Sequence, residues 1–369
     1  MARILDGYQT EAIKEAASLI QKGGVVAFPT ETVHGLGADA FNPKAVALIF
    51  EVKKRPRFDP LIVHIAELSD VKKVCLHADD RAGKVMEWFW PGPLTVVLPK
   101  TPEVPDIVTA GLPTVAVRLP SHPVALSLIR EARTPIAAPS ANLFGYLSPT
   151  TAEHVNEQLG SAIEIILDDQ QSAVGSRQSG AGWGTSDYRL STWNRVGVES
   201  TIIDLSEEEP VLLRPGGTPL EEIERVIGRV KIPPHDPQQP RSPGQLPHHY
   251  SPRTPLKILL DEELSIEYRV LSFEEGGGTP DSRLQTPDSR LERVGLLAFQ
   301  RPREGDFAAI EVLSPSGDLR EAAANLFAAL HRLDSAGLDL ILAEPVPEGG
   351  LGRAIMDRLR RASGVLSRR

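Results

Sequence analysis

Short apolar stretches alternate with amphipathic ones along the first half of the chain, and this alternation restricts the possible folds more than any other feature. The apolar stretches predict buried strands at residues 25–28, 61–65, 94–98, 114–119, 135–138, 163–167 and 198–205. The amphipathic stretches predict helices at residues 10–22, 43–54, 79–90, 123–132 and 151–159. Several strands follow each other too closely for a helical crossover, so parallel and antiparallel pairs should be mixed. The pattern predicts an α/β fold.

Two segments interrupt this rhythm and suggest how the chain is divided. A length of 369 residues predicts two domains, since a domain has about 100–200 residues. Residues 231–255 are rich in proline and predict an extended linker. A second, smaller α/β domain is expected at 256–369. Residues 170–195 are rich in Gly, Ser and polar residues, which predicts a long loop within the first domain.

Composition excludes several classes of protein. A formal net charge of -9 argues against a protein whose main role is to bind a nucleic-acid backbone. The single cysteine, Cys75, excludes an internal disulfide framework and a Cys-rich zinc site, and it predicts a reducing, cytoplasmic compartment. No apolar run reaches the length of about 18 residues expected of a membrane-spanning helix. The charged N-terminus is unlike a signal peptide.

Five segments carry polar residues of the kinds that bind small anionic ligands. They are FPTETVHGLG (28–37), KKRP (53–56) with PLIVHI (60–65), TVAVRLPSHP (114–123), PIAAPSANLFGYLSPT (135–150), and VGVESTIIDL (196–205) with VLLRPG (211–216). The chain has no Walker GxxxxGK[ST] sequence and no GxGxxG after a strand. Lys, Arg, Ser and Asn side chains would therefore have to hold any nucleotide phosphates.

Each segment taken alone also fits a purely structural role. A helix C-terminus attracts cations such as Lys53 and Arg55 through its dipole. His64 within an apolar strand fits a core histidine. A buried Arg118 needs an anion, which is either a substrate carboxylate or an Asp or Glu of the chain. Ser140 fits a turn as well as a ligand contact at a strand end.

Taken together and in this order, the segments resemble the YrdC/Sua5 family of threonylcarbamoyl-AMP synthases. FWPGPLTVVL (89–98) extends the resemblance, which covers about residues 10–230, and SPGQLPHHYSPRTPL (242–256) resembles the linker of the two-domain Sua5 branch. The resemblance implies an open, twisted, mixed α/β sheet in a YrdC-like catalytic domain at 1–230. It also implies a linker or lid at 231–255 and a Rossmann-like C-terminal α/β domain at 256–369.

The resemblance also implies roles for individual residues. ATP phosphates are expected at Lys53, Arg55, Ser140 and Asn142, and the first two are the expected catalytic residues. L-Threonine is expected at Thr30, His64, Arg118 and Ser200. Thr114, Ser148 and Arg214 are expected near the nucleotide, and Tyr250 is expected to contact it from the linker as part of a lid.

The implied reaction condenses L-threonine, bicarbonate and ATP to threonylcarbamoyl-adenylate and pyrophosphate, for the t6A modification of tRNA. Mg²⁺ is expected to bind through ATP, and no protein metal ligand is assigned. The product would pass to a threonylcarbamoyl-transferase complex, and direct tRNA binding is left open. Arg55→Ala is expected to leave the fold intact and to abolish pyrophosphate release.

Two departures from the family pattern leave alternatives open. The family usually has Tyr where His34 stands, and residues 170–195 are an insertion that is either a solvent loop or an added lid beside Ser200. An RNA-binding module, or a synthase inactivated by the insertion, would share the same motifs. A carbamoyltransferase of the hydrogenase-maturation type is disfavoured, because those proteins carry zinc-binding cysteines.

Overall fold

The computed structural model describes residues 1–169, 195–233, 240–244, 250–259, 293–302 and 305–364, and it forms two compact units. Unit 1 comprises Met1–Phe144 and Ser148–Leu246, and unit 2 comprises Gly145–Leu147 and Pro247–Arg369. The predicted loop at 170–195 lies outside the described residues, except for Arg195.

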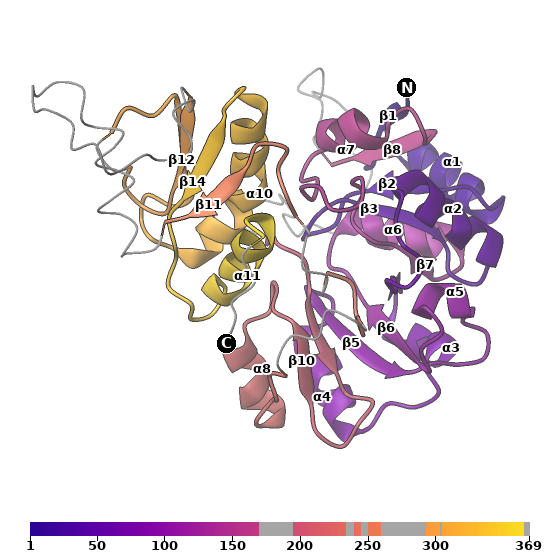
Figure 1. Ribbon diagram of the computed structural model, residues 1–369. Helices are drawn as coiled ribbons and strands as arrows, with labels where there is room; N and C mark the ends of the chain where they lie inside the picture. The colour runs from indigo at the N-terminus through magenta and orange to yellow at the C-terminus, as the bar shows by residue number, and fades with distance from the viewer. Residues whose placement is uncertain (170–194, 234–239, 245–249, 260–292, 303–304, 365–369) are drawn as a thin grey trace, which may run out of the picture. The chain divides into compact units, whose positions relative to one another are not determined.

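Unit 1 is built on a mixed sheet in the order β1-β8-β2-β3-β7-β4-β6-β5-β9-β10 (Figure 1). Its strands are β1 (Arg3–Asp6), β2 (Val26–Phe28), β3 (Gly35–Asp39), β4 (Ile62–His64), β5 (Leu94–Pro99), β6 (Thr114–Arg118), β7 (Ile136–Ala137), β8 (Ile165–Asp168), β9 (Thr201–Asp204) and β10 (Val211–Arg214). Parallel pairs such as β2 with β8 and β4 with β6 occur beside antiparallel pairs such as β2 with β3. The expectation of a mixed α/β sheet is confirmed.

Helices cover one face of this sheet fully and the other face only in part. They are α1 (Thr10–Gln21), α2 (Pro43–Lys53), α3 (Val71–Val74), α4 (Asp80–Phe89), α5 (Asp106–Thr109), α6 (Pro123–Ala132), α7 (Ala152–Leu159) and α8 (Leu220–Ile227), with a 3-10 turn at Leu68–Asp70. The first face packs against α2, α4, α7 and α8 in the largest core cluster. On the second face, α1 and α6 pack over β2, β7 and β8.

Beside the part covered by α1 and α6, the second face carries a small patch of buried apolar residues, here called the strand patch. Its residues are Ile62, Val97, Ala116, Ile202 and Leu213, which come from β4, β5, β6, β9 and β10. Among the described residues, no helix residue belongs to this cluster, and its members are all buried, with at most 7% of their surface exposed.

Strand β3, which contains Gly35 and Gly37, was not predicted from sequence. The segment is a strand paired antiparallel with β2. A Cβ at Gly37 would lie 2.5 Å from Ile136 Cγ2 and 2.6 Å from Phe28 Cε1. Glycine is uncommon in strands, and it is needed here because neighbouring side chains pass directly over the backbone.

Unit 2 contains a parallel sheet in the order β11-β14-β12-β13. Its elements are β11 (Leu256–Ile258), β12 (Val294–Ala298), β13 (Ala309–Val312), α10 (Leu319–Ser335), β14 (Leu340–Ala343) and α11 (Gly352–Ala362), drawn in orange to yellow in Figure 1. This agrees with the expected small α/β domain. Among the described residues of the whole chain, none of the helices has the length and apolarity needed to span a bilayer.

Candidate active site

Strand register places two of the expected threonine contacts side by side. His64 at the end of β4 is the parallel partner of Arg118 at the end of β6. Side chains alternate between the two faces of a strand, so His64 shares a face with Ile62, and Arg118 shares that face with Ala116. Both residues therefore stand next to the strand patch, on the partly covered face of the sheet.

Lys53 occupies the end of α2 and is buried, with 1% of its surface exposed. The helix begins at Asn42, whose side chain accepts hydrogen bonds from two backbone amides, and Pro43 provides the preset first turn. The Lys53 Nζ lies 2.6 Å from the Ser140 carbonyl oxygen and also donates to the Asn142 carbonyl. The structure thus brings Lys53 together with the Ser140–Asn142 segment.

Arg55 forms a buried ion pair with Asp59. Its Nη2 lies 2.8 Å from Asp59 Oδ2, and the two side chains are 2% and 0% exposed. The guanidinium also donates to the Pro60 carbonyl at 3.0 Å and stacks on the Phe144 ring at 5.9 Å. The expectation that Arg55→Ala leaves the fold intact does not fit this arrangement, because the substitution would strand a buried carboxylate.

Three cations gather around that one carboxylate. Burial raises the pKa of Asp59, and the positive charges of Arg55, Lys53 and Arg214 act against this rise. All four side chains are at most 6% exposed. Three of these four side chains are basic and one is acidic, so this part of unit 1 is suited to hold a polyanion.

Arg214, at the end of β10, connects this cation group to Ser200. Its Nη2 lies 2.8 Å from the Ser200 carbonyl and 3.1 Å from the Ser200 hydroxyl, and its Nη1 donates to the Pro243 carbonyl at 3.2 Å. The Ser200 hydroxyl also lies 2.8 Å from the Thr95 hydroxyl. The described linker residues near Pro243 therefore lie directly against the site.

Thr30 and Arg118, two of the expected threonine contacts, belong to one network through Thr32. The Thr30 and Thr32 hydroxyls are 2.8 Å apart, and Arg118 Nη1 donates to Thr32 Oγ1 at 3.0 Å. Arg118 Nη2 lies 2.6 Å from Glu31 Oε1, and both side chains are buried. Of the two anions proposed for Arg118 from sequence, the structure shows one supplied by the chain, Glu31, which sequence reasoning missed.

His64 is a neutral imidazole at ordinary pH. Burial, and next the positive charge of Arg118, lower the pKa of His64 to about 3. Its Nδ1 is buried and has no hydrogen-bond partner. A buried polar atom of this kind can hydrogen-bond an uncharged or zwitterionic ligand.

Three of the expected nucleotide contacts are placed as follows. Ser148 is buried, and its hydroxyl donates to Glu199 Oε1 at 2.5 Å, next to Ser200. Thr114 begins β6, at the opposite end of the strand from Arg118. Tyr250 belongs to unit 2, where its ring packs 5.8 Å from the Phe327 ring.

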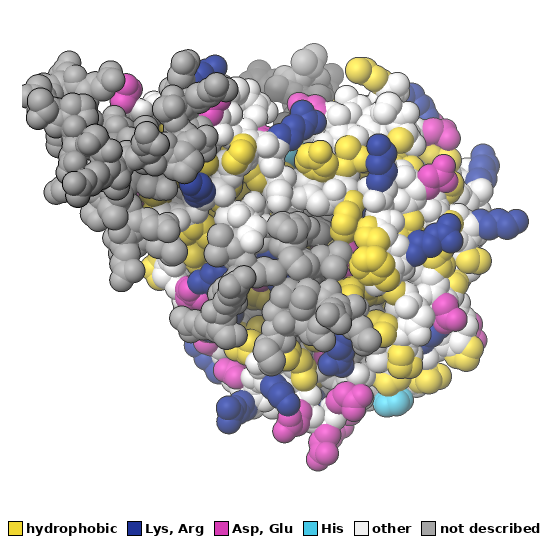
Figure 2. Space-filling model, viewed as in Figure 1, with side chains coloured by type: hydrophobic (Ala, Val, Ile, Leu, Met, Phe, Trp, Pro, Cys, Tyr) yellow, Lys and Arg dark blue, Asp and Glu magenta, His cyan; other side chains and the backbone are white. Residues whose placement is uncertain are grey.

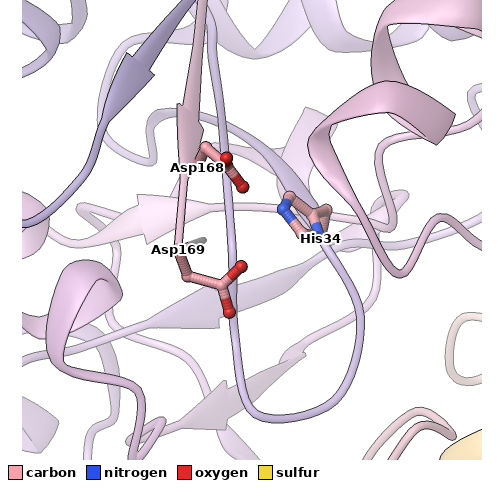
Figure 3. Close-up of side chains that lie close together, drawn as sticks. All are labelled: His34, Asp168 and Asp169. Atoms are coloured by element: carbon pink, nitrogen blue, oxygen red, sulfur yellow. The ribbon is translucent and has the colours of Figure 1, made fainter. Parts of the chain in front are cut away.

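One further group of polar side chains in unit 1 was not found from sequence. His34, Asp168 and Asp169 lie together at the end of β8 (Figure 3). Burial lowers the pKa of His34 to about 3. Burial alone would raise the pKa of Asp169, but a hydrogen bond from His122 and the charge of Arg195 lower it. Sequence spacing gives no sign of this group, because the strand pairing that assembles it is nonlocal.

Two family models and several known proteins match the chain. Residues 18–179 match the Sua5/YciO/YrdC family model, which is described as telomere recombination. Residues 218–364 match the model described as threonylcarbamoyl-AMP synthase, C-terminal domain. The threonylcarbamoyl-AMP synthase of Pyrococcus abyssi is 42% identical over 95% of this chain and 94% of its own length.

Two further relatives match over nearly their full lengths. The threonylcarbamoyl-AMP synthase of Bacillus subtilis is 41% identical over 95% of this chain and 93% of its own. The crystal structure of P. abyssi Sua5 complexed with L-threonine superposes with a TM-score of 0.81 at 40% identity, covering 99% of this chain and 98% of that one. The chain therefore belongs to the Sua5-type family of threonylcarbamoyl-AMP synthases, and it carries both domains of that family.

Proposed function

We propose that unit 1 condenses L-threonine, bicarbonate and ATP to threonylcarbamoyl-AMP and pyrophosphate on the partly covered face of its sheet. The observation that carries the proposal is the group of Lys53, Arg55 and Arg214 around Asp59. Buried basic side chains gathered in this way favour an anion in the same site. ATP supplies such an anion, and the chain's close relatives are synthases of this kind.

On the ATP side, Lys53, Arg55 and Arg214 would neutralise the phosphates, with Lys53 and Arg55 acting at the reacting centre. Ser140, Asn142 and Ser148 would add hydrogen bonds, since Lys53 already holds the Ser140–Asn142 segment in place. Because the three cations do not ligate metal ions, Mg²⁺ would arrive with ATP, held by phosphates and water. Thr114 and Tyr250 remain predicted nucleotide contacts.

On the threonine side, Arg118 and Glu31 suit a zwitterion. Arg118 would share its guanidinium with the substrate carboxylate, and Thr30, His64 and Ser200 would complete the contacts. We add Glu31, whose Oε2 is buried without a hydrogen-bond partner, while its Oε1 pairs with Arg118. The ammonium group of threonine supplies a donor of the kind that Oε2 lacks.

The reaction needs positioning and charge neutralisation rather than a protein nucleophile. The threonine ammonium group first releases a proton to solvent. The resulting amine attacks bicarbonate, giving an N-carboxylate and water. An oxygen of this carbamate then attacks the α-phosphorus, a new P–O bond forms, and the bond to the β-phosphate breaks as pyrophosphate leaves. Negative charge builds up on the phosphoryl oxygens and on pyrophosphate, so fixed cations around the phosphates lower the barrier.

The product would serve the t6A modification of tRNA in the cytoplasm, through a threonylcarbamoyl-transferase. The chain's single cysteine fits such a reducing compartment. Direct tRNA binding gains little support from the surface seen in Figure 2, where basic and acidic side chains of the described residues are mixed. Broad basic areas are the usual signature of nucleic-acid binding.

The proposal is tested by incubating the full chain with ATP, L-threonine and bicarbonate, and by omitting each in turn. Pyrophosphate release and an adenylate seen by mass spectrometry should require all three. Lys53→Gln should lower the rate strongly, because it removes a buried charge from the phosphate site. Lys54→Gln is the matched control, since the neighbouring Lys54 is exposed. Pyrophosphate release that is independent of threonine would refute the proposed reaction.

A further inference from the structure

His34, Asp168 and Asp169 form a compact group of potential ligand atoms in unit 1. Each residue offers one such atom, and these atoms lie within 4.8 Å of one another. Figure 3 shows a ring nitrogen of His34 turned toward the two carboxylates. The group arises because β2 and β8 run parallel, so that the segment after β2 and the end of β8 meet at the same edge of the sheet.

Two buried atoms of this group lack hydrogen-bond partners. His34 is 2% exposed, and its Nε2 has no partner. The Asp169 side chain is 6% exposed, and its Oδ1 also has none. Buried polar atoms are almost always paired in folded proteins, so two orphans in one group indicate a missing ligand. An imidazole nitrogen and a carboxylate oxygen are both electron-pair donors, which a cation satisfies together.

The other oxygen of Asp169 is already held by the chain. Oδ2 pairs with Arg195 and lies 3.3 Å from His122 Nε2. Arg195 also donates to the Thr150 carbonyl at 3.0 Å. These contacts fix the orientation of the Asp169 carboxylate without using Oδ1, as outer-shell partners do for metal-binding carboxylates.

We propose that His34, Asp168 and Asp169 bind a divalent metal ion through one nitrogen and two carboxylates. Such mixed ligands suit Mn²⁺ or Zn²⁺ better than Mg²⁺, which prefers oxygen ligands alone. Three protein ligands leave coordination positions for water. The site is distinct from the Mg²⁺ expected on ATP, because its ligands belong to the chain and need no nucleotide.

The position of the group connects it to the proposed phosphate site. The His34 carbonyl accepts a hydrogen bond from the Ala141 amide at 2.8 Å, and the next residue, Gly35, forms a bridge with Ser140. An ion held by His34 would therefore restrain the backbone beside the segment that Lys53 also holds. This consequence rests on the proposed function, whereas metal binding itself does not.

Mn²⁺ binding to the full chain, without nucleotide or threonine, tests the proposal. Free Mn²⁺ is measured by electron paramagnetic resonance during a titration. We expect one ion per chain, and His34→Gln should weaken its binding more than about tenfold, since even outer-shell changes cost 10–100-fold. The matched control is His77→Gln, because His77 is exposed and outside the group. His248 and His249, which lie outside the described residues, are unchanged in both variants. The readout is therefore the difference in Mn²⁺ affinity between His34→Gln and His77→Gln.

Thermal unfolding gives a second, independent measurement. Mn²⁺ should raise the unfolding temperature of the wild type and of His77→Gln, but not that of His34→Gln, because only ligands that bind the folded state stabilise it. His34→Tyr, which carries the residue usual in the family, replaces His34→Gln if that variant does not fold. Equal Mn²⁺ affinity in the wild type and the folded His34 variant would overturn the proposal. So would the absence of bound Mn²⁺ in the wild type. Both results leave the synthase assay unaffected, so the two proposals fail separately.

Discussion

Replacing Arg55 with alanine should destabilise unit 1 by about 3–5 kcal/mol, the cost of breaking a buried ion pair from one side. The pair is 2.8 Å apart, and its side chains are 2% and 0% exposed, so water does not replace the lost guanidinium. For a domain of this size, 1 kcal/mol corresponds to roughly 2–4 °C of unfolding temperature. The expected decrease is therefore about 6–20 °C.

The loss should also depend on pH, with a sign that follows from Asp59. Burial already raises the pKa of this carboxyl, and the charge of Arg55 opposes the rise. Without Arg55 the folded-state pKa rises further above the unfolded value. Between the unfolded-state and folded-state pKa values of Asp59, the folded variant binds more protons than the unfolded chain. Its stability therefore falls as pH rises through this range. The destabilisation should be smaller at about pH 5 than at about pH 8.

Guanidinium unfolding followed by circular dichroism measures these quantities. A double-mutant cycle with Asp59→Asn isolates the pair, and the double variant should recover part of the stability lost in Arg55→Ala. Arg57→Ala is the control, because Arg57 is exposed on the same segment. If Arg55→Ala and Arg57→Ala have the same guanidinium denaturation midpoint at about pH 8, the buried pair does not stabilise the fold and the reasoning is wrong.

Three other predictions concern single positions. Gly37→Ala should lower the free energy of unfolding by about 1–3 kcal/mol through overpacking. Gly83→Ala, in helix α4 with open space at its Cβ, should raise it by up to about 1 kcal/mol. Denaturation midpoints that move in the same direction for both variants would contradict this. Burial raises the pKa of Cys75 to about 12, so iodoacetamide at mildly alkaline pH should label it only after unfolding, and rapid labelling of the native chain by intact mass would argue against it. Burial, and then the charge of Arg55, lower the pKa of Lys53, so ATP binding should take up protons and weaken as pH rises through that lowered pKa. Calorimetry in buffers of different ionisation enthalpy measures this uptake, and uptake that persists unchanged in Lys53→Gln would exclude Lys53 as its source.

Much of the secondary structure is determined by local sequence. Helix α6 has the predicted bounds, Pro123–Ala132, because a proline at its first position and a capping side chain at His122 set its start. Strand β3 was missed because glycine carries no hydrophobic signal. Strand β1 (Arg3–Asp6) was missed because it is largely exposed and charged, so neither strand shows the pattern of a buried one.

The order of the motifs also identified the family from sequence alone, and the matches of both domains confirm it. Motif order does not reveal which anion balances each buried cation. Only the tertiary structure pairs Arg55 with Asp59 and Arg118 with Glu31. Burial makes such pairing necessary, but the choice of partner depends on backbone positions that local patterns do not specify.

The group of His34, Asp168 and Asp169 shows the same limit most clearly. Its members come from segments far apart in the sequence, and none of them stands in a recognisable metal-binding spacing. They meet because β2 pairs in parallel with β8, across several intervening helices and strands. Local residue preferences determine where each strand lies along the chain. Which strands become neighbours is decided by the packing of the whole sheet, and that choice creates the site.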